Sequence, residues 1–433
     1  MTPQIKHRIE QIRRGEVPEG YKRTKVGIVP DEWKIVKLDS ISSHVTKKNS
    51  DGKIQTTFTN SATQGIIRQT DYFDKEISNR ENITGYYVVQ EDDYIYNPRI
   101  STSAPCGPIN KSHFAEDGVA SPLYTVFKMK GDLHKNRYIE YYLKISFWHR
   151  CMCGVAKYGA RHDRMNITND DLFGMPILFP TLEEQQKIAE ILSAQDKLIA
   201  LKEKLIEEKK RQKISIADKL FSPEYIKQKS PLANKTSFAQ ICSVVTDYVS
   251  NGSFKSLKDN VEYLEQGHAV LLRLADYNNG FDKNKFIYIN EKAFNFLSRS
   301  IVYPNDIIIA NVGSVGAVFR APDLKMPMSL APNTILVRTN ISNDYFYHFV
   351  CSTRGQELLK TITSTTAQPK FNKTDFKSLE MYVPNEDVQR NTSQILNLVD
   401  KEIEILQKDL DQEKQKKKAL MQLLLTGIVR VNV

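Results

Sequence analysis

Residues 180–221 read PTLEEQQKIAEILSAQDKLIALKEKLIEEKKRQKISIADKLF, and residues 384–425 read PNEDVQRNTSQILNLVDKEIEILQKDLDQEKQKKKALMQLLL. The second stretch repeats the first at one constant offset without a gap, so that Gln185 corresponds to Gln389 and Asp196 to Asp400. A repeat this long in a chain of 433 residues is half a protein and not a solenoid unit. The sequence therefore predicts two similar modules, each closed by a similar long segment.

Both copies have the features of a long helix. Each follows a proline that ends an apolar, strand-like run, and the acidic residues that come next suit the positive end of a helix dipole. Apolar pairs then recur at heptad intervals, the spacing of a coiled-coil seam, along a rod of roughly 60 Å. A helix this long and polar needs a partner, and its own repeat is the simplest one; the alternative is that each helix only caps its own domain. The predicted interface residues are Ile191, Leu192, Leu198, Ile199, Leu205, Ile206, Ile395, Leu396, Ile403 and Leu410.

The rest of the chain divides around these helices. Short apolar runs, a few amphipathic stretches and many Gly, Asn and Ser turns predict two α+β (mixed α/β) globules, and Asp93–Asn97 in the first is echoed by Asp306–Ala310 in the second. The expected order is a basic lead-in (1–32), a first globule (33–179), a central helix (180–222), a linker (223–235), a second globule (236–383) and a carboxyl-terminal helix with its tail (384–433).

Composition bounds the class of protein. The chain is 40% hydrophobic and 26% charged, and it has no run of apolar residues long enough to span a membrane. Its amino terminus is polar and lacks the apolar core of a signal peptide, and its five cysteines have no framework spacing. These features predict a cytoplasmic protein with reduced thiols. A net charge of +10 is compatible with a polyanionic partner.

Several fragments invite a catalytic or metal-binding interpretation that the sequence does not support. Tyr96-Asn-Pro-Arg99 resembles part of the Asn-Pro-Pro-aromatic loop of amino-group DNA methyltransferases, but the second proline, the aromatic residue and a Gly-rich cofactor turn are missing. Gly313-Ser-Val-Gly316 lacks the Gly-Lys-Ser/Thr of a phosphate-binding loop, so a tight turn is expected there. A cluster of possible metal ligands lacks the spacing of a zinc site: His149, Cys151, Cys153 and His162. Its two cysteines are expected to be free thiols. We predict neither a catalytic residue nor a bound metal in this chain.

Two loops at matched places in the repeat carry the side chains that read nucleic acid. Residues 157–166 combine basic, aromatic and amide side chains, and residues 365–373 do the same in the second half. Arginine reads guanine and asparagine or glutamine reads adenine, whereas lysine and serine hold phosphates. The predicted DNA-binding residues are Arg68, Tyr72, Arg99, Ser101, Thr102, Lys157, Tyr158, Arg161, Arg164, Asn166, Arg273, Asn278, Asn311, Ser314, Gln368, Lys370, Asn372 and Lys373.

Four segments together resemble the specificity subunits of Type I restriction–modification systems. They are the lead-in before the first globule, the proline-to-Glu-Gln opening of the central helix, a segment of the second globule and the carboxyl-terminal tail, at 20–33, 180–189, 305–316 and 416–430. The second helix departs from the pattern, since its opening lacks the doubled glutamine. Recognition domains vary between members, so no base-reading residue is carried over from the family.

The resemblance implies two target-recognition domains held apart by an antiparallel pair of coiled-coil helices, with pseudo-twofold symmetry in one chain. Each domain would read one half of a bipartite DNA target. The helices would dock two methyltransferase subunits, which bind S-adenosylmethionine, and restriction subunits would add ATP- and Mg-dependent cleavage in phage defence. No cofactor would bind this chain, which would act in a bacterial or archaeal cytoplasm. Two alternatives are a coiled-coil scaffold with protein-binding globules and a fused enzyme that acts on DNA.

Overall fold

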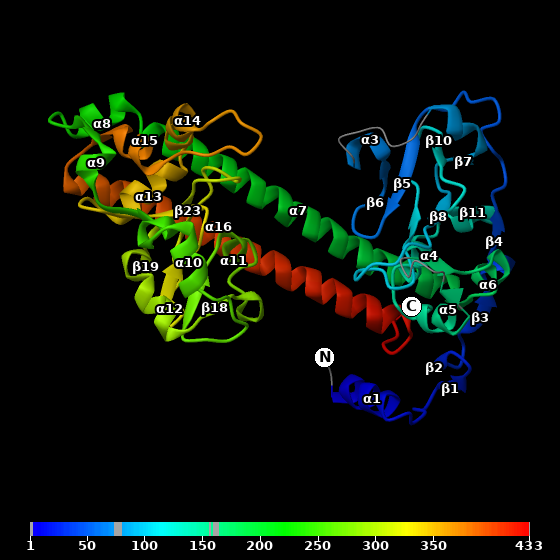
Figure 1. Cartoon of the computed structure of the whole chain (residues 1–433). Helices are drawn as coiled ribbons and strands as arrows, with labels where there is room; N and C mark the ends of the chain where they lie inside the picture. The colour runs from blue at the N-terminus through cyan, green and yellow to red at the C-terminus, as the bar shows by residue number, and fades with distance from the viewer. Residues whose placement is uncertain (1–2, 73–79, 156, 159–163, 433) are drawn as a thin grey trace. The chain divides into compact units, whose positions relative to one another are not determined.

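The chain forms two compact units, which we describe separately. A computed structural model describes residues 3–432 except 73–79, 156 and 159–163 (Figure 1). The first unit is Met1–Lys202 together with Asp409–Val433, and the second is Glu203–Lys408. Each unit therefore contains one globule and about half of each long helix.

The first globule contains two four-stranded sheets, with the strand orders β6–β5–β10–β7 and β4–β11–β8–β9. Strands β5 and β10 run parallel, and the other neighbours in these sheets run antiparallel. The strands are β4 (Ser42–His44), β5 (Thr57–Ser61), β6 (Gly65–Arg68), β7 (Tyr87–Val89), β8 (Tyr94–Tyr96), β9 (Ile109–Lys111), β10 (Gly118–Ala120) and β11 (Thr125–Met129).

The second globule repeats this topology strand for strand. Its sheets have the orders β18–β17–β22–β19 and β16–β23–β20–β21, and β17 and β22 are the parallel pair. The strands are β16 (Cys242–Asp247), β17 (Ala269–Leu272), β18 (Tyr288–Ile289), β19 (Ile301–Val302), β20 (Ile307–Ala310), β21 (Val318–Arg320), β22 (Met328–Leu330) and β23 (Thr334–Thr339). The internal repeat therefore includes the globules, where the two sequences match only loosely.

One turn shows how closely the two globules correspond. Asp92 and Asn305 both adopt a left-handed backbone, with φ of 68° and 67°, directly before the buried strands β8 and β20. The next residue is an aspartate in each globule, and its carboxylate accepts a hydrogen bond from the backbone amide three residues earlier, at 2.8 Å for Asp93 and 2.7 Å for Asp306. The correspondence of Asp93 and Asp306 predicted from the sequence is confirmed.

A short two-stranded ladder joins the two chain ends of each globule. Strand β3 (Lys34–Lys37) pairs with β14 (Pro176–Phe179), and β15 (Asn234–Ser237) pairs with β24 (Glu380–Val383), both antiparallel. A proline follows each exit strand, and because proline cannot donate to a ladder, the strand ends before the long helix begins. The chain thus enters and leaves each globule through two neighbouring strands.

The long helices are unbroken, α7 from Leu182 to Leu220 and α16 from Glu386 to Leu425. Residues 223–235, expected as a linker, contain the helix α8, because Ser222 caps its amino terminus and Pro223 stands at its first turn. The remaining helices are α1 (Pro3–Arg13), α2 (Leu38–Ile41), α3 (Gln69–Tyr72), α4 (Arg137–Tyr142), α5 (His149–Val155), α6 (Asn169–Phe173), α8 (Pro223–Lys229), α9 (Phe238–Ile241), α10 (Phe254–Asn260), α11 (Leu274–Asn278), α12 (Glu291–Phe296), α13 (Asn343–Cys351), α14 (Thr353–Ile362) and α15 (Lys373–Ser378).

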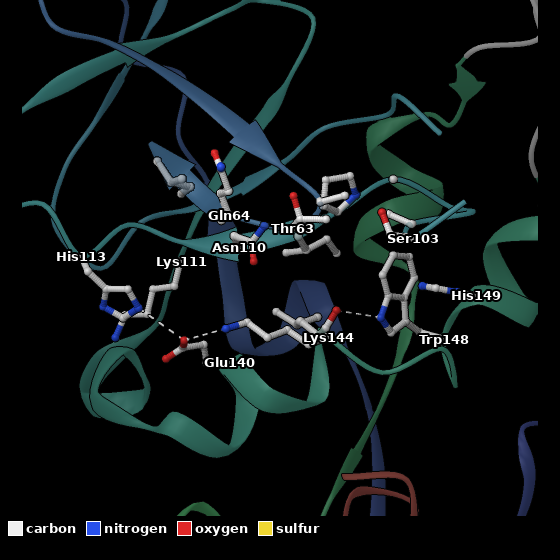
Figure 2. Close-up of a pocket in the computed structure, with 18 of the residues that line it drawn as sticks. Thr63, Gln64, Ser103, Asn110, Lys111, His113, Glu140, Lys144, Trp148 and His149 are labelled. Carbon is white, nitrogen blue, oxygen red and sulfur yellow. Dashed lines mark hydrogen bonds and ion pairs between the residues drawn. The ribbon is translucent and has the colours of Figure 1, made fainter. Parts of the chain in front are cut away.

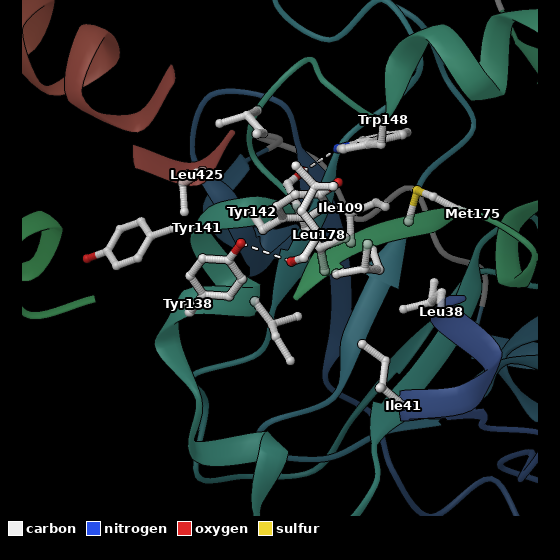
Figure 3. Packing of buried hydrophobic residues seen from close by; sticks show 14 of the residues in the cluster. Leu38, Ile41, Ile109, Tyr138, Tyr141, Tyr142, Trp148, Met175, Leu178 and Leu425 are labelled. Carbon is white, nitrogen blue, oxygen red and sulfur yellow. Dashed lines mark hydrogen bonds between the residues drawn. The ribbon is translucent and has the colours of Figure 1, made fainter. Parts of the chain in front are cut away.

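The main core of the first unit lies between the β8 sheet, α4 and the two long helices. Tyr138 and Tyr142 of α4 pack with Trp148 and with Leu425 from the end of α16 (Figure 3). The buried hydroxyl of Tyr138 donates to the carbonyl of Leu178 at 2.9 Å, so the polar tip of this ring is satisfied. In the second unit, the corresponding core combines aliphatic side chains with a group of aromatic rings, which includes Phe221, Phe238, Tyr345, Phe346 and Phe376.

The lead-in and the carboxyl-terminal tail lie against each other in the first unit. The lead-in forms a hairpin of β1 (Tyr21–Thr24) and β2 (Gly27–Pro30), and the hydroxyl of Tyr21 donates to the carbonyl of Gly427 at 2.9 Å. Gly427 has φ of 72°, and a Cβ atom there would lie 2.5 Å from the ring of Pro30, so this contact requires glycine. Among the described residues, no helix has both the length and the apolar composition to cross a membrane.

Candidate nucleic-acid interface

Two loops meet at one end of the β8 sheet in the first globule. The loop that follows β8 carries Arg99, and the segment that precedes α6 carries Arg164. An isolated antiparallel bridge joins these two arginines, and the amide of Met165 donates to the carbonyl of Pro98 at 3.0 Å. The sequence predicted DNA-contacting residues in both segments, and the fold brings the segments together.

The second globule forms the same junction at the matched place. The loop after β20 and the segment before α15 are joined by a bridge between Val312 and Lys370. The carbonyl of Asn311 accepts from the amide of Phe371 at 3.1 Å, and the side-chain amide of Asn311 donates back to the carbonyl of Phe371 at 3.2 Å. Asn311 therefore fixes the junction, and any contact with a base by its side chain stays a prediction.

The charges at these junctions point to an anionic ligand. Arg99, Arg164 and Lys370 are exposed, and no described residue pairs with their charged groups. The bridge brings two arginines without a described acidic partner to one place on the surface of the globule. Guanidinium groups in this setting are suited to the phosphates of a nucleic acid.

Three other predicted basic residues are paired within their own globule. Their N–O distances are 2.8 Å for Arg68–Glu116, 2.6 Å for Arg273–Asp276 and 2.8 Å for Lys373–Asp247. Asp276 is buried, and Lys373 also donates to the hydroxyl of Ser250 at 2.6 Å. These side chains have a role inside the fold, and their contact with DNA stays a prediction.

The remaining predicted DNA-binding residues are exposed or lie outside what the structure describes. Those with exposed side chains are Ser101, Thr102, Asn166, Asn278, Ser314, Gln368 and Asn372. Arg161 lies outside the described residues, and the side chains of Tyr72, Lys157 and Tyr158 are outside the described part as well. Asn372 also caps α15, since its side chain accepts from the amide of Asp375 at 2.8 Å. Base contacts by these residues stay predictions.

The loop after β8 also lines a cleft of about 490 Å³ in the first globule (Figure 2). Thr63 and Gln64 from the β5–β6 hairpin line it together with Ser103. The Asn110 side chain donates to Asn60 Oδ1 at 2.7 Å and so ties the hairpin to the strand that follows the loop. Sequence reasoning missed these residues because no local pattern indicates that the hairpin and the loop are neighbours.

One buried carboxylate sets the charge of this cleft. The side chain of Glu140 is 6% exposed, and its Oε1 lies 3.3 Å from His113 Nε2 and 3.1 Å from Lys144 Nζ (Figure 2). Burial raises the pKa of Glu140, but the hydrogen bond with His113 and the charge of Lys144 together outweigh burial and lower the pKa to about 2. The carboxylate is therefore ionised at neutral pH and offsets the charge of Lys144.

The second globule has a more aromatic cleft, of about 670 Å³. Tyr248, Phe254 and Tyr263 line it together with Asn311 of the junction. Phe254 is 84% exposed and Tyr263 is 52% exposed, which is unusual for large rings and is typical of a surface that a partner covers. Sequence reasoning missed both rings, because no local pattern distinguishes them from core aromatic residues.

The fragments that resembled catalytic or metal sites have structural roles. The side-chain amide of Asn97 donates to the carbonyl of Asn60 at 2.9 Å, and its oxygen accepts from the amide of Arg99 at 3.0 Å. Gly313 and Gly316 have φ of 78° and 86°, as expected for a tight turn. Within the described ranges, no three His, Cys, Asp or Glu side chains are placed to hold a metal ion, and His162 lies outside those ranges.

The matched glutamines of the two long helices lock each helix to its globule. The side chain of Gln185 donates to the carbonyl of Pro180 at 2.8 Å and accepts from the side chain of Asn136, which caps α4. The side chain of Gln389 donates to the carbonyl of Pro384 at 2.8 Å and accepts from the amide of Ser342, which caps α13, at 3.0 Å. Both glutamines are buried.

The two helices pair antiparallel, and in each predicted apolar pair one residue is more deeply buried than its neighbour. Leu192 and Leu396 are buried in the cores that the helices share with their globules, Ile206 and Leu410 are buried farther along the helices, and Ile191, Ile199 and Ile403 are partly buried. Three predicted residues lie outside the seam, since Leu198, Leu205 and Ile395 are 37%, 39% and 42% exposed. Adjacent residues of a helix point about 100° apart, so a seam takes only one of each pair.

Lysines complete the seam where apolar residues are missing. In the first unit, Lys202 pairs with Asp409 and Lys417 pairs with Asp196. In the second unit, the N–O distances are 2.7 Å for Lys209–Glu402 and 2.5 Å for Lys213–Asp400. All four lysine side chains are 20–27% exposed, so their aliphatic stems cover the seam while their charges meet acidic residues of the other helix.

Comparison with known proteins identifies the family. The model of the type I restriction modification DNA specificity domain matches residues 30–211 and 245–414. The chain belongs to the type I restriction–modification DNA specificity family. The sequence-based assignment and the two-domain fold with long helices are therefore confirmed, and the chain is the DNA-specificity component of such a system.

Two archaeal specificity subunits are similar over nearly their whole length. The type I restriction enzyme MjaX specificity subunit of Methanocaldococcus jannaschii is 26% identical, over 95% of this chain and 97% of that protein. The MjaVIII specificity subunit of the same organism is 24% identical, over 95% of this chain and 96% of that protein. A solved structure described as the basis of complex assembly and conformational transition of the type I R-M system has a TM-score of 0.59 at 11% identity, covering 93% of this chain and 99% of that chain. This likeness shows the same fold.

Proposed function

We propose that this specificity chain binds duplex DNA without catalysing a reaction, and that each globule reads one half of a bipartite target. The observation that carries the proposal is the duplicated junction of two loops with exposed, unpaired basic side chains, Arg99 and Arg164 in one globule and Lys370 in the other. Two similar modules with different loop residues suit two unequal half-sites.

Methyltransferase and restriction subunits dock on the long helices in this proposal. Leu201, Leu398 and Ile405 are 65%, 67% and 58% exposed on helical surfaces outside the seam. Large apolar side chains exposed along a helix are typical of a surface that a partner covers. The predicted seam residues Leu198, Leu205 and Ile395 lie on the same exposed side of their helices and are candidates for that contact.

The chemistry belongs to the partner subunits in this proposal. S-adenosylmethionine would bind the methyltransferase subunits, and ATP and Mg would act in the restriction subunits. The work of this chain is then to position the partners on a chosen sequence. The buried carboxylates and tyrosines described above have structural roles that suit such a scaffold.

The test is selection of bound DNA from a random duplex library by the chain co-purified with its methyltransferase partner. We expect one enriched motif with two defined halves and an unread spacer, and we expect the same motif to be methylated in cells that contain the chain. Replacing both Arg99 and Arg164 by alanine should weaken enrichment of every sequence.

A coiled-coil scaffold for other proteins is the second candidate, favoured by the exposed apolar residues of the helices. The same selection separates the two functions. A scaffold would enrich no motif, and its binding to DNA would not depend on Arg99 or Arg164.

A further inference from the structure

Two thiols of the first globule lie in contact. Cys106 is on the loop after β8, and Cys153 is on α5, and their sulfur atoms are 3.2 Å apart. Cys106 is fully buried and Cys153 is exposed, so one thiol is sheltered and the other meets solvent. A disulfide has an S–S distance of about 2.05 Å, so closure needs the sulfurs to approach by roughly 1.2 Å.

At the matched place in the second globule, a glutamine side chain joins the loop to the helix. There, the amide of Gln356 on α14 donates to the carbonyl of Gly316, on the loop after β20, at 2.9 Å, and to the carbonyl of Val350 at 2.8 Å. The loop after β8 and the helix α5 occupy the matched places in the first globule. The same joint is therefore held by a redox-inert amide in one globule and by a pair of thiols in the other.

We propose that Cys106 and Cys153 form an oxidisable pair, a modification site at which a peroxide closes a disulfide that fastens the β8 loop to α5. The loop carries Arg99, and Arg99 is bridged to Arg164. The disulfide would therefore restrain both elements of the junction in the first globule, and the second globule has no equivalent response.

The chemistry is a two-step oxidation by hydrogen peroxide. The Cys153 thiolate attacks a peroxide oxygen, the O–O bond breaks and hydroxide leaves, which gives a sulfenic acid on Cys153. The Cys106 sulfur then attacks the Cys153 sulfur, the S–S bond forms, and the S–O bond breaks with loss of water that takes up the Cys106 proton. Burial raises the pKa of the Cys106 thiol to about 12, which suits the exposed Cys153 as the first thiol to react.

The test uses the full chain, co-purified with its partner if necessary, treated with hydrogen peroxide and then alkylated. Peptide mapping without reduction should recover a peptide in which Cys106 is linked to Cys153, while Cys242 and Cys351 remain open to alkylation after unfolding. Cys153→Ser should abolish the linked peptide. Cys151→Ser is the matched control, because it removes a thiol of the same helix and should leave the link intact. Linkage of Cys106 to Cys151, or no linkage while Cys153 is overoxidised, would overturn the proposal.

Limited proteolysis tests separately whether the disulfide restrains the junction. Trypsin cleaves after exposed arginines, so cleavage after Arg99 and Arg164 reports opening of the two elements. Oxidation of the parent chain should slow this cleavage by roughly tenfold or more, and Cys153→Ser should show no such change. Equal cleavage rates for the oxidised and reduced parent, with the disulfide present in the map, would show that the link restrains neither element.

Discussion

Two equivalent aspartates, one in each globule, differ in whether a cationic side chain pairs with them. Asp306 is held by Arg338, whose Nε and Nη2 donate to the two carboxylate oxygens at 2.7 and 2.6 Å. The matched residue in the first globule is Asp93, and the position of Arg338 is taken there by the exposed Lys128. Within the described part of the chain, no cation forms an ion pair with Asp93. Burial therefore raises the pKa of the Asp93 carboxyl to about 6.

This pKa predicts that ionisation of Asp93 destabilises the first globule. The folded pKa lies above the ordinary value of 3.8, so the stabilisation is complete below that value and is lost as pH rises through 6. The contribution is about 3 kcal/mol of unfolding free energy. Asp93→Asn should remove this dependence and make the chain more stable at about pH 8, by up to about 2 kcal/mol. Urea unfolding of both proteins between about pH 4 and about pH 8 measures it. Parallel pH curves would contradict the prediction.

Asp306→Asn is the matched control and should have the opposite sign. It leaves the guanidinium of Arg338, which is 27% exposed, without its carboxylate partner. A partly buried charge that loses its partner costs roughly 2–4 kcal/mol. The loss should appear at neutral pH in the same unfolding measurement.

The matched glutamines give a second prediction at this scale. Gln185→Ala and Gln389→Ala should each lower the unfolding free energy by about 2 kcal/mol, because each leaves a buried proline carbonyl without its donor. Gln186→Ala is the control, since Gln186 is an exposed neighbour. Denaturant unfolding of the three variants checks this. A loss for Gln186→Ala as large as for Gln185→Ala would mean that helix propensity, and not the buried hydrogen bonds, sets the effect.

Arg99 and Arg164 give a third prediction at the residue scale. Arg99→Ala and Arg164→Ala should each weaken binding to all duplexes by roughly tenfold and flatten the dependence of log K on log salt by about one unit, because each removes one phosphate contact. Lys130→Ala is the control, since Lys130 follows β11 at the opposite end of the same sheet. Fluorescence titration at several salt concentrations measures both quantities. An unchanged slope with a loss confined to one base position would show that the residue reads sequence instead.

At the scale of elements, the seam of the long helices rests on few apolar residues. Ile206 is 2% exposed, and its neighbour Leu205 is 39% exposed, although heptad spacing alone does not separate them. Lysines whose charges pair across the helices fill the gaps. The helices are thus held by a few deep contacts and by charge pairing that fixes their register.

The adjacent residues Leu205 and Ile206 allow a direct test of which one lies in the seam. Ile206→Ala should lower the unfolding free energy by roughly 2–4 kcal/mol, because it opens a cavity in the seam. Leu205→Ala should change it by less than about 1 kcal/mol in the isolated chain, because Leu205 is already 39% exposed and its loss opens no enclosed cavity. Denaturant unfolding of the two variants compares them. If Leu205→Ala instead weakens co-purification with the methyltransferase partner, the exposed side is the docking surface; equal losses of stability would place both residues in the seam.

At the scale of the whole molecule, each globule is an insertion with paired ends. Lys34 pairs with Phe179 at the edge of the first ladder, and Asn234 pairs with Val383 at the edge of the second. A module whose entry and exit strands are neighbours can be replaced without changing the path of the chain outside it.

Exchanging residues 33–179 for the domain of another family member should therefore change one half of the methylated motif and leave the other half unchanged. Methylome sequencing of cells carrying the exchanged chain measures this. The control is an exchange of residues 236–383, which should change the other half only. A change in both halves, or in neither, would rule out two independent readers.

The sequence by itself determined the repeat, the two long helices and the family, because periodic apolar positions, helix starts after proline and paired motifs are local features of the chain. It also placed candidate DNA-binding residues on the loops that meet, such as Arg99 and Arg164. Only the tertiary structure decided which of two adjacent apolar residues enters the seam, since that depends on the register of two helices far apart in the chain. It also decided that Lys373 pairs with Asp247 inside the fold and that Cys106 contacts Cys153, because each of these contacts joins segments that are far apart in the chain.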